Sequence, residues 1–260
     1  MIDYLRTELR KRNIMAHIFD SNEGALLWDL GWNGAIPPVD HDYLSVVDSS
    51  LPGHTTKDVF RTWKYQVSLR VERPLESRFW VRYDHQGEVR DDKVCRQSEP
   101  GSSNCYWNYF RIYFPAVADN IVAPPVPLNQ GAEKLIWGYP DPDSLSLGLS
   151  TDVGPAPLTE IGGFIAVAPD SVMTVPLSYQ LPWKTVRALG GNNYEYRLLL
   201  QKQPGIDTDL IEVALELPPG SEVINASPAP IAQNGNWLSF KFELGADTQV
   251  VVSFRTPDGN

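Results

Sequence analysis

The chain has 260 residues, of which 42% are hydrophobic, so it can bury a sizeable core, and global disorder is excluded. Its formal net charge of −10 disfavours nucleic-acid binding, because such a surface repels a phosphate backbone. No apolar run approaches the roughly 20 residues that a membrane-spanning helix needs. We therefore expect no transmembrane segment of its own.

The N-terminal region is predicted to contain both helix and strand. Ile2, Leu5 and Leu9 recur at helical spacing, and a second helical run stops at Gly31. A short strand follows. We therefore expect residues 1–55 to form a small α/β segment that looks like the tail of a larger domain.

From residue 56 to residue 260 the dominant pattern is alternation of apolar and polar residues. Leu238, Phe240 and Phe242, for example, alternate with Ser239 and Lys241. Because side chains alternate faces along a strand, each such run predicts a strand with one buried face and one solvent-exposed face. The expected strands cover 60–72, 78–83, 106–114, 163–167, 171–181, 194–201, 211–217, 237–244 and 249–254. We predict a mainly β fold, an Ig-like antiparallel β-sandwich over 56–260 with a small N-terminal α/β piece.

A proline-dense stretch interrupts this pattern between residues 115 and 160. Proline cannot donate a hydrogen bond to a sheet, so we expect a long surface excursion there. Trp137 lies within it.

The two cysteines flank a turn-rich polar loop between strand-like segments. A disulfide between Cys95 and Cys105 is favoured over two free thiols, because inert free cysteines usually lie in an apolar core. Such a bridge implies an oxidising compartment.

The sequence shows no catalytic constellation. The four histidines have no metal-ligand spacing, and there is no nucleophile elbow or phosphate-cradling loop. We interpret the following as ordinary polar residues of loops: Asp40, His41, Asp42 and His85. We expect no enzymatic activity, no cofactor and no metal.

Two of the eight tryptophans are candidates for an interaction surface. Trp80 falls on the polar phase of its strand with Arg82, and Trp137 lies in the proline-rich stretch. Exposed aromatic side chains form sugar-stacking or protein-docking surfaces, whereas the other tryptophans are expected to pack in the core or on the sheets.

The order of several segments resembles the C-terminal half of the bacterial DUF4012 family. The segments include Leu26-Leu27-Trp28-Asp29-Leu30-Gly31-Trp32, Trp107-Asn108-Tyr109-Phe110-Arg111 and Gln201-Lys202-Gln203-Pro204-Gly205. The resemblance covers most of the chain and implies a membrane-anchored, envelope-facing protein of uncharacterised function. The family's upstream half resembles LytR-CpsA-Psr envelope domains and carries a Glu-Leu-Arg-Pro-Thr-Gly-Gly-Phe type motif. That motif is absent here, so no activity is carried over.

The expected function is that of a non-enzymatic, extracytoplasmic structural or interaction subunit at the bacterial cell surface. Its expected partners are other envelope or membrane-anchored subunits. Two alternatives remain open: a carbohydrate-binding module that uses exposed tryptophans, and a fragment of a glycopolymer transferase of the LytR-CpsA-Psr type.

Overall fold

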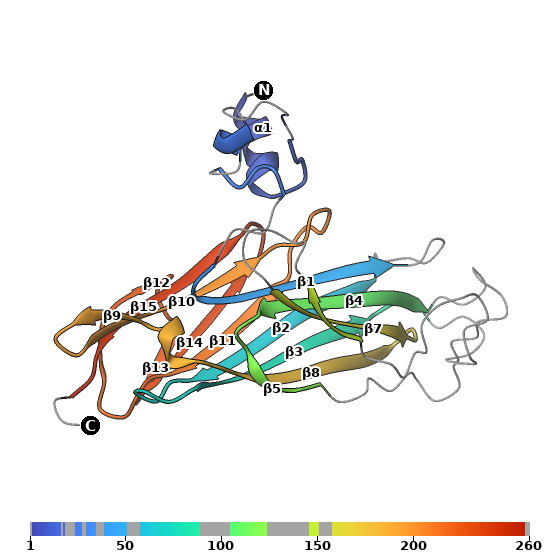
Figure 1. Cartoon of the computed structure of the whole chain (residues 1–260). Coiled ribbons are helices and arrows are strands. Elements are labelled where there is room, and N and C mark those ends of the chain that lie inside the picture. Colours follow the sequence, from blue (N-terminus) through green and yellow to red (C-terminus); the bar gives the residue numbers. More distant parts are fainter. Residues whose placement is uncertain are drawn as a thin grey trace.

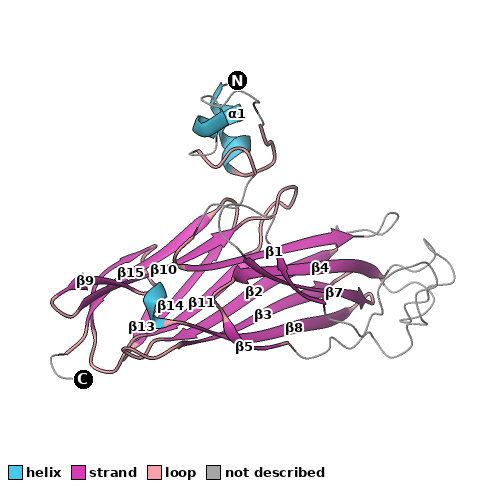
Figure 2. Ribbon diagram, viewed as in Figure 1, coloured by secondary structure: helices cyan, strands magenta, loops and turns pink. Residues whose placement is uncertain are grey.

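Two β-sheets packed face to face make up most of the molecule (Figures 1 and 2). The computed structural model describes residues 2–16, 18, 24–27, 30–34, 39–50, 58–88, 105–123, 146–150 and 158–257. Within these ranges the chain is mainly β, which confirms the predicted sandwich.

Sheet A has eight strands. Their spatial order is β12 (Glu222–Ser227), β15 (Thr248–Arg255), β10 (Asn193–Gln201), β1 (Asp42–Ser50), β4 (Tyr106–Pro115), β7 (Leu158–Val167) and β6 (Ser146–Ser150), with β9 (Arg187–Gly190) paired to β10 off this path. The short 3₁₀ helix η1 (Trp183–Thr185) leads into β9.

Sheet B has seven strands. Their spatial order is β13 (Ala232–Asn234), β14 (Trp237–Glu243), β11 (Leu210–Glu216), β2 (Val59–Ser68), β3 (Leu75–His85), β8 (Ser171–Leu181) and β5 (Asp119–Val122). The edge strands β5 and β6 both come from the expected surface excursion over 115–160, and they pair with β8 and β7. Residues 124–145 and 151–157 of that stretch lie outside the described residues.

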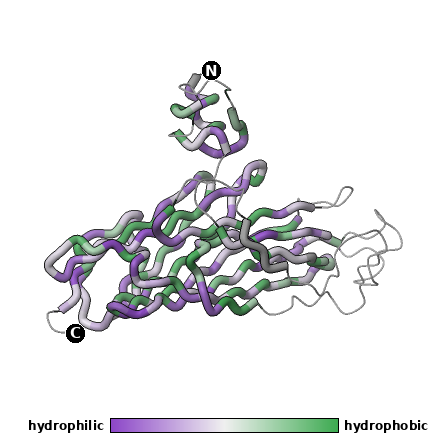
Figure 3. Tube along the Cα trace, viewed as in Figure 1, coloured by the Kyte–Doolittle hydropathy of each residue, from purple (hydrophilic) through white to green (hydrophobic). Residues whose placement is uncertain are grey.

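The core lies between the sheets, where the apolar faces of the longer strands are buried. On β2, for instance, Trp63, Tyr65 and Val67 are fully buried, whereas Lys64 between them is exposed. Figure 3 shows hydrophobic and hydrophilic residues interspersed along the strands of both layers. The nine strands expected from alternation correspond to β2, β3, β4, β7, β8, β10, β11, β14 and β15.

Two parallel strand pairs divide the sandwich into two halves. Residues 42–181 supply β1 to β8, and residues 187–257 supply β9 to β15. The halves meet at β1–β10 in sheet A and at β2–β11 in sheet B, and these are the parallel pairs among otherwise antiparallel neighbours. We call these two pairs the seam. The fold is therefore two smaller sandwiches joined through continuous mixed sheets, which refines the expected antiparallel arrangement.

The position of β1 corrects the expected boundary at residue 55. We assigned residues 42–50 to the N-terminal segment, but β1 lies between β10 and β4 inside sheet A. Leu44 faces the core, while Tyr43 packs on the other side with Tyr113 and Leu158. Because both faces of β1 are covered, its sequence lacks the clear alternation of the other strands.

The described residues between 2 and 34 form what we call the N-terminal unit, which stands beside the sandwich (Figure 1). It contains α1 (Ile2–Arg10), as predicted, and a helical turn over 24–27. The Arg12 guanidinium reaches Asp247, just before β15, with Nη2 2.7 Å and Nε 3.0 Å from Oδ2. This ion pair fastens the unit to the sandwich.

Candidate functional site

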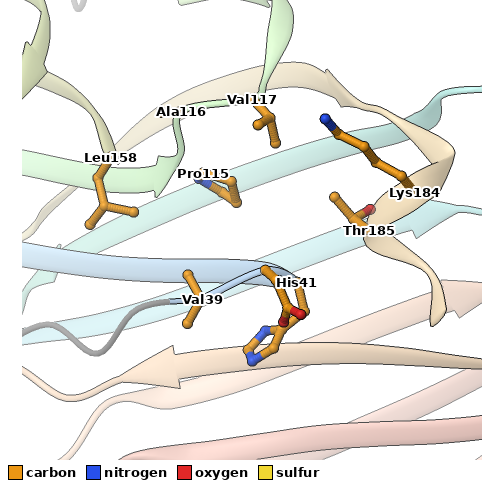
Figure 4. Close-up of a pocket in the computed structure, with 9 residues that line it drawn as sticks. Val39, His41, Pro115, Ala116, Val117, Leu158, Lys184 and Thr185 are labelled. Atoms are coloured by element: carbon orange, nitrogen blue, oxygen red, sulfur yellow. The ribbon is translucent and has the colours of Figure 1, made fainter. Parts of the chain in front are cut away.

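A surface cavity of about 330 Å³ opens where β1 begins and β4 ends (Figure 4). Its apolar lining consists of Val39, Pro115, Ala116, Val117 and Leu158, and its polar lining consists of Asp40, His41, Lys184 and Thr185.

Two of the polar groups of this cavity, those of His41 and Thr185, are used in local structure. His41 Nδ1 lies 2.8 Å from the carbonyl oxygen of Asp42, which can only accept, so this nitrogen carries the proton. The Thr185 hydroxyl donates to the carbonyl oxygen of Pro182 at 3.0 Å. Imidazole and hydroxyl are thus not paired with each other as base and nucleophile would be.

Asp42 is fully buried between the sheets, which corrects the expectation that it is an ordinary loop residue. Tyr65 of sheet B and Tyr196 of sheet A each donate a hydroxyl hydrogen bond to its Oδ2 at 2.6 Å, and the Tyr43 amide donates to Oδ1 at 2.8 Å. Burial raises the pKa of Asp42 to about 6, although these three hydrogen bonds act in the opposite direction. The carboxyl group is therefore fixed by three hydrogen bonds in the core and is inaccessible to solvent.

Asp48 occupies a similar environment at the other end of β1. Tyr83 of sheet B donates to its Oδ1 at 2.8 Å, and Tyr106 of sheet A lies 3.4 Å from Oδ2. Here a cation is added, because Arg61 Nη1 lies 2.7 Å from Asp48 Oδ2. The same guanidinium makes a bidentate contact with Asp209, with Nε–Oδ1 and Nη2–Oδ2 distances of 2.6 Å.

Burial and charge act against each other on Arg61. Desolvation disfavours the charged guanidinium, but the carboxylates of Asp48 and Asp209 outweigh it, so the pKa of Arg61 lies well above its ordinary value. Arg61 therefore stays charged in the interior and is neutralised on both sides.

Both buried clusters cross the seam. Asp42 and Tyr65 come from the first half and Tyr196 from the second, while Asp48 and Arg61 come from the first half and Asp209 from the second. Their hydrogen bonds and ion pairs therefore connect the two halves across the seam. One feature of the sequence points to these buried clusters. Asp42 and Asp48 alternate along β1 with the same period as Leu44 and Val46, which face the core.

The sequence-predicted surface residues divide between described and undescribed parts of the chain. Trp80 lies on the outer face of sheet B, between Lys64 and Pro176, and is partly exposed. Trp137 and Cys95 lie outside the described residues. Cys105 is buried just before β4, and the Cys95–Cys105 bridge stays a prediction.

Apolar side chains are concentrated on the surface of the N-terminal unit. The exposed large ones are Tyr4, Leu5, Ile14, Met15, Ile18, Leu26 and Leu30. Sequence reasoning did not identify these residues individually, because their exposure depends on the fold of the unit.

The part of the chain that the structure describes contains neither a cluster of metal ligands nor a membrane-spanning helix. No group of three or more His, Cys, Asp or Glu side chains within them has the arrangement of a metal site. None of the helices that the structure describes is long and apolar enough to cross a membrane.

No protein-family model and no curated protein matches this sequence. Among solved structures, the chain is similar to a provisionally assigned nutrient-binding protein from Legionella pneumophila, with a TM-score of 0.48 and 7% identity over 84% of this chain and 72% of that one. It is also similar to LTA4 hydrolase from yeast, with a TM-score of 0.33 and 10% identity over 79% of this chain and 30% of the hydrolase. Likenesses this remote carry no argument about function.

Proposed function

We propose that this protein is a non-enzymatic structural and interaction subunit of a bacterial cell envelope, and that it acts outside the cytoplasm. The observation that carries the proposal is the apolar surface of the N-terminal unit. Its partner is a membrane-anchored envelope protein that covers this surface.

The N-terminal unit is too small to bury its own apolar side chains. Leu9 and Leu27 are its buried hydrophobic residues within the described ranges, whereas Tyr4 is 69% and Leu26 59% exposed. Below about 40 residues a chain rarely forms a sufficient core without a disulfide, a metal or a partner. A protein partner that covers these side chains supplies the missing burial.

The charge around this surface specifies the partner further. Arg6, Arg10 and Lys11 are exposed beside Tyr4 and Leu5 on and just after α1. The complementary surface is therefore apolar with a rim of carboxylates, the usual anatomy of a protein interface.

The sandwich supports a structural role in the same subunit. Four of its buried ionisable groups, Asp42, Asp48, Arg61 and Asp209, are used to join the two halves across the seam. A long body in which these buried charged groups are hydrogen-bonded suits a spacer or a platform for interactions. The extracytoplasmic setting is supported by the family resemblance and by the predicted Cys95–Cys105 disulfide.

The test begins with isolation of the tagged full chain from the envelope fraction of its source under mild detergent. A membrane-anchored protein that co-purifies at fixed stoichiometry is then produced separately, and its affinity for the full chain is measured by calorimetry. The double variant Tyr4→Glu/Leu5→Glu is expected to weaken binding at least tenfold, because it places two charges in the apolar contact.

Ile231→Glu is the matched control, since Ile231 is 64% exposed but lies on the sandwich. It is expected to leave the affinity unchanged. The proposal is wrong if the double variant binds as tightly as the parent chain. It is also wrong if the chain in envelope extracts is bound to anionic lipid vesicles and to no protein.

A further inference from the structure

Trp80 stands at the centre of a three-strand grid on the outer face of sheet B. The register of β3 with β2 and β8 places Lys64 and Pro176 on either side of it. Residues two apart on a strand share a face, so the adjoining rows share this surface. The rows are Thr62–Arg82–Thr174 and Gln66–Arg78–Ser178. We call these nine residues the Trp80 grid.

The grid is a cationic region on an acidic protein. It contains Lys64, Arg78 and Arg82 and no aspartate or glutamate, although the whole chain carries a net charge of −10. Arg82 is half exposed and pairs with Asp84, which lies just beyond the grid, at 2.9 Å. Lys64 and Arg78 are exposed. Carboxylates border the grid, since Asp84 pairs with Arg82 and Glu212 lies opposite Lys64, but all three cations face solvent.

The shape of the grid favours a sugar polymer over a peptide. β2 and β3 are interior strands of sheet B, and β8 is paired to β5 at Ser178 and Gln180, so most of this surface offers side chains and not a backbone edge. Extended peptides bind to sheet edges or into grooves. The grid spans about 10 Å across three strands and about 14 Å along them, which is the scale of two or three sugar rings.

The chemistry of the side chains matches an acidic sugar. The flat indole of Trp80 offers an apolar face to the C–H side of a pyranose ring. The guanidinium groups of Arg78 and Arg82 have the fork geometry that binds carboxylates. The remaining rim consists of hydroxyl and amide groups from Thr62, Gln66, Thr174 and Ser178, which are able to donate hydrogen bonds to, and accept them from, sugar hydroxyls.

We propose that the outer face of sheet B binds an acidic polysaccharide that contains uronic acid residues. Trp80 stacks on a sugar ring, and Lys64, Arg78 and Arg82 bind the carboxylates. The inference goes beyond the interaction-subunit role, because the Trp80 grid is separate from the N-terminal unit.

The experiment measures the affinity of the full chain for polygalacturonate by calorimetry at two salt concentrations. The parent chain is expected to bind more weakly at the higher salt concentration. Trp80→Ala is expected to lower the affinity at least tenfold with little change in salt dependence. Arg78→Gln/Arg82→Gln is expected to lower it at least tenfold and to flatten the salt dependence.

Matched controls come from the same face of the same sheet. Trp237→Ala removes another partly exposed tryptophan, and Lys241→Gln removes a cation that pairs with Glu212 at 2.9 Å. Both are expected to bind within twofold of the parent chain. Thermal unfolding of each variant confirms that it is folded, and Trp80→Tyr, which keeps an aromatic ring, is expected to retain most of the affinity.

Three results would overturn the inference: no binding of polygalacturonate, full binding by the folded Trp80→Ala variant, or equal binding of poly-glutamate, which signifies an acidic protein partner. Neutral dextran is expected not to bind. None of these results bears on the envelope partner, because the variants tested for that partner lie in α1.

Discussion

Asp42 and Asp48 point into the sandwich from opposite ends of β1, and each is bound by one tyrosine from each sheet. The tyrosines are Tyr65 and Tyr196 for Asp42, and Tyr83 and Tyr106 for Asp48. Only Asp48 also has a cation, Arg61. This difference leads to separate predictions for the two carboxylates.

For Asp42 we predict a pH-dependent stability that the Asp42→Asn variant lacks. Its pKa is raised from 3.8 to about 6, so between these values the folded state holds a proton that the unfolded state has released. The free energy of unfolding therefore falls as pH rises from about 4 to about 6, by up to about 3 kcal/mol, and changes no further above that. Urea unfolding of both proteins across this range measures the difference.

Asp119→Asn serves as the control for this comparison, because Asp119 is exposed on the edge strand β5. Its pH profile is expected to follow that of the parent chain. Parallel profiles for the parent and Asp42→Asn would show that burial does not raise this pKa.

For Arg61 we predict that Arg61→Met destabilises the fold by about 3–5 kcal/mol, because Asp48 and Asp209 would remain buried without their cation. Arg70→Met is the control. Arg70 pairs with Glu216 at 2.8 Å, but its side chain is 40% exposed, so its loss is expected to cost about 1 kcal/mol or less. Chemical denaturation measures the free energy of unfolding of the two variants, and Arg61→Met is expected to lose clearly more stability than Arg70→Met. Equal losses would contradict the role of Arg61 as the buried cation of Asp48 and Asp209.

For Arg12 we predict that Arg12→Gln releases the N-terminal unit without destabilising the sandwich. The charge-assisted bonds to Asp247 contribute roughly 1.5–3 kcal/mol, so amide exchange in α1 is expected to quicken at least about tenfold. Exchange in the sandwich strands should not change. Arg6→Gln, at an exposed position of α1, is expected to leave amide exchange unchanged both in α1 and in the sandwich strands.

For the cysteines we predict a disulfide between Cys95 and Cys105 in the protein recovered from its natural compartment. Thiol labelling under denaturing conditions is expected to modify neither residue before reduction and both after it. Labelling of both without reduction would place the protein in a reducing compartment and remove one support for the envelope setting.

The strands with one solvent-exposed face were predictable, because the alternation of apolar and polar residues can be recognised within each short segment. Residues 237–244 show it in sequence, and the structure has β14 over Trp237–Glu243. The strands β5, β6, β9, β12 and β13 were not expected. Most side chains of β5, β9, β12 and β13 are exposed, because an edge strand buries little, so burial gives their sequences no strong apolar phase. β1 was placed in the wrong unit because both its faces are covered.

The sequence by itself determined that this chain forms two layers of strands with apolar inner faces, because that property depends only on the period of two. Tertiary structure alone decided which strands become neighbours, and so made the parallel seam. It also brought Arg61 to Asp209, 148 positions away, and set Lys64 and Pro176 beside Trp80. Such contacts depend on strand order and register, which arise only when distant segments pair and bury their apolar faces together.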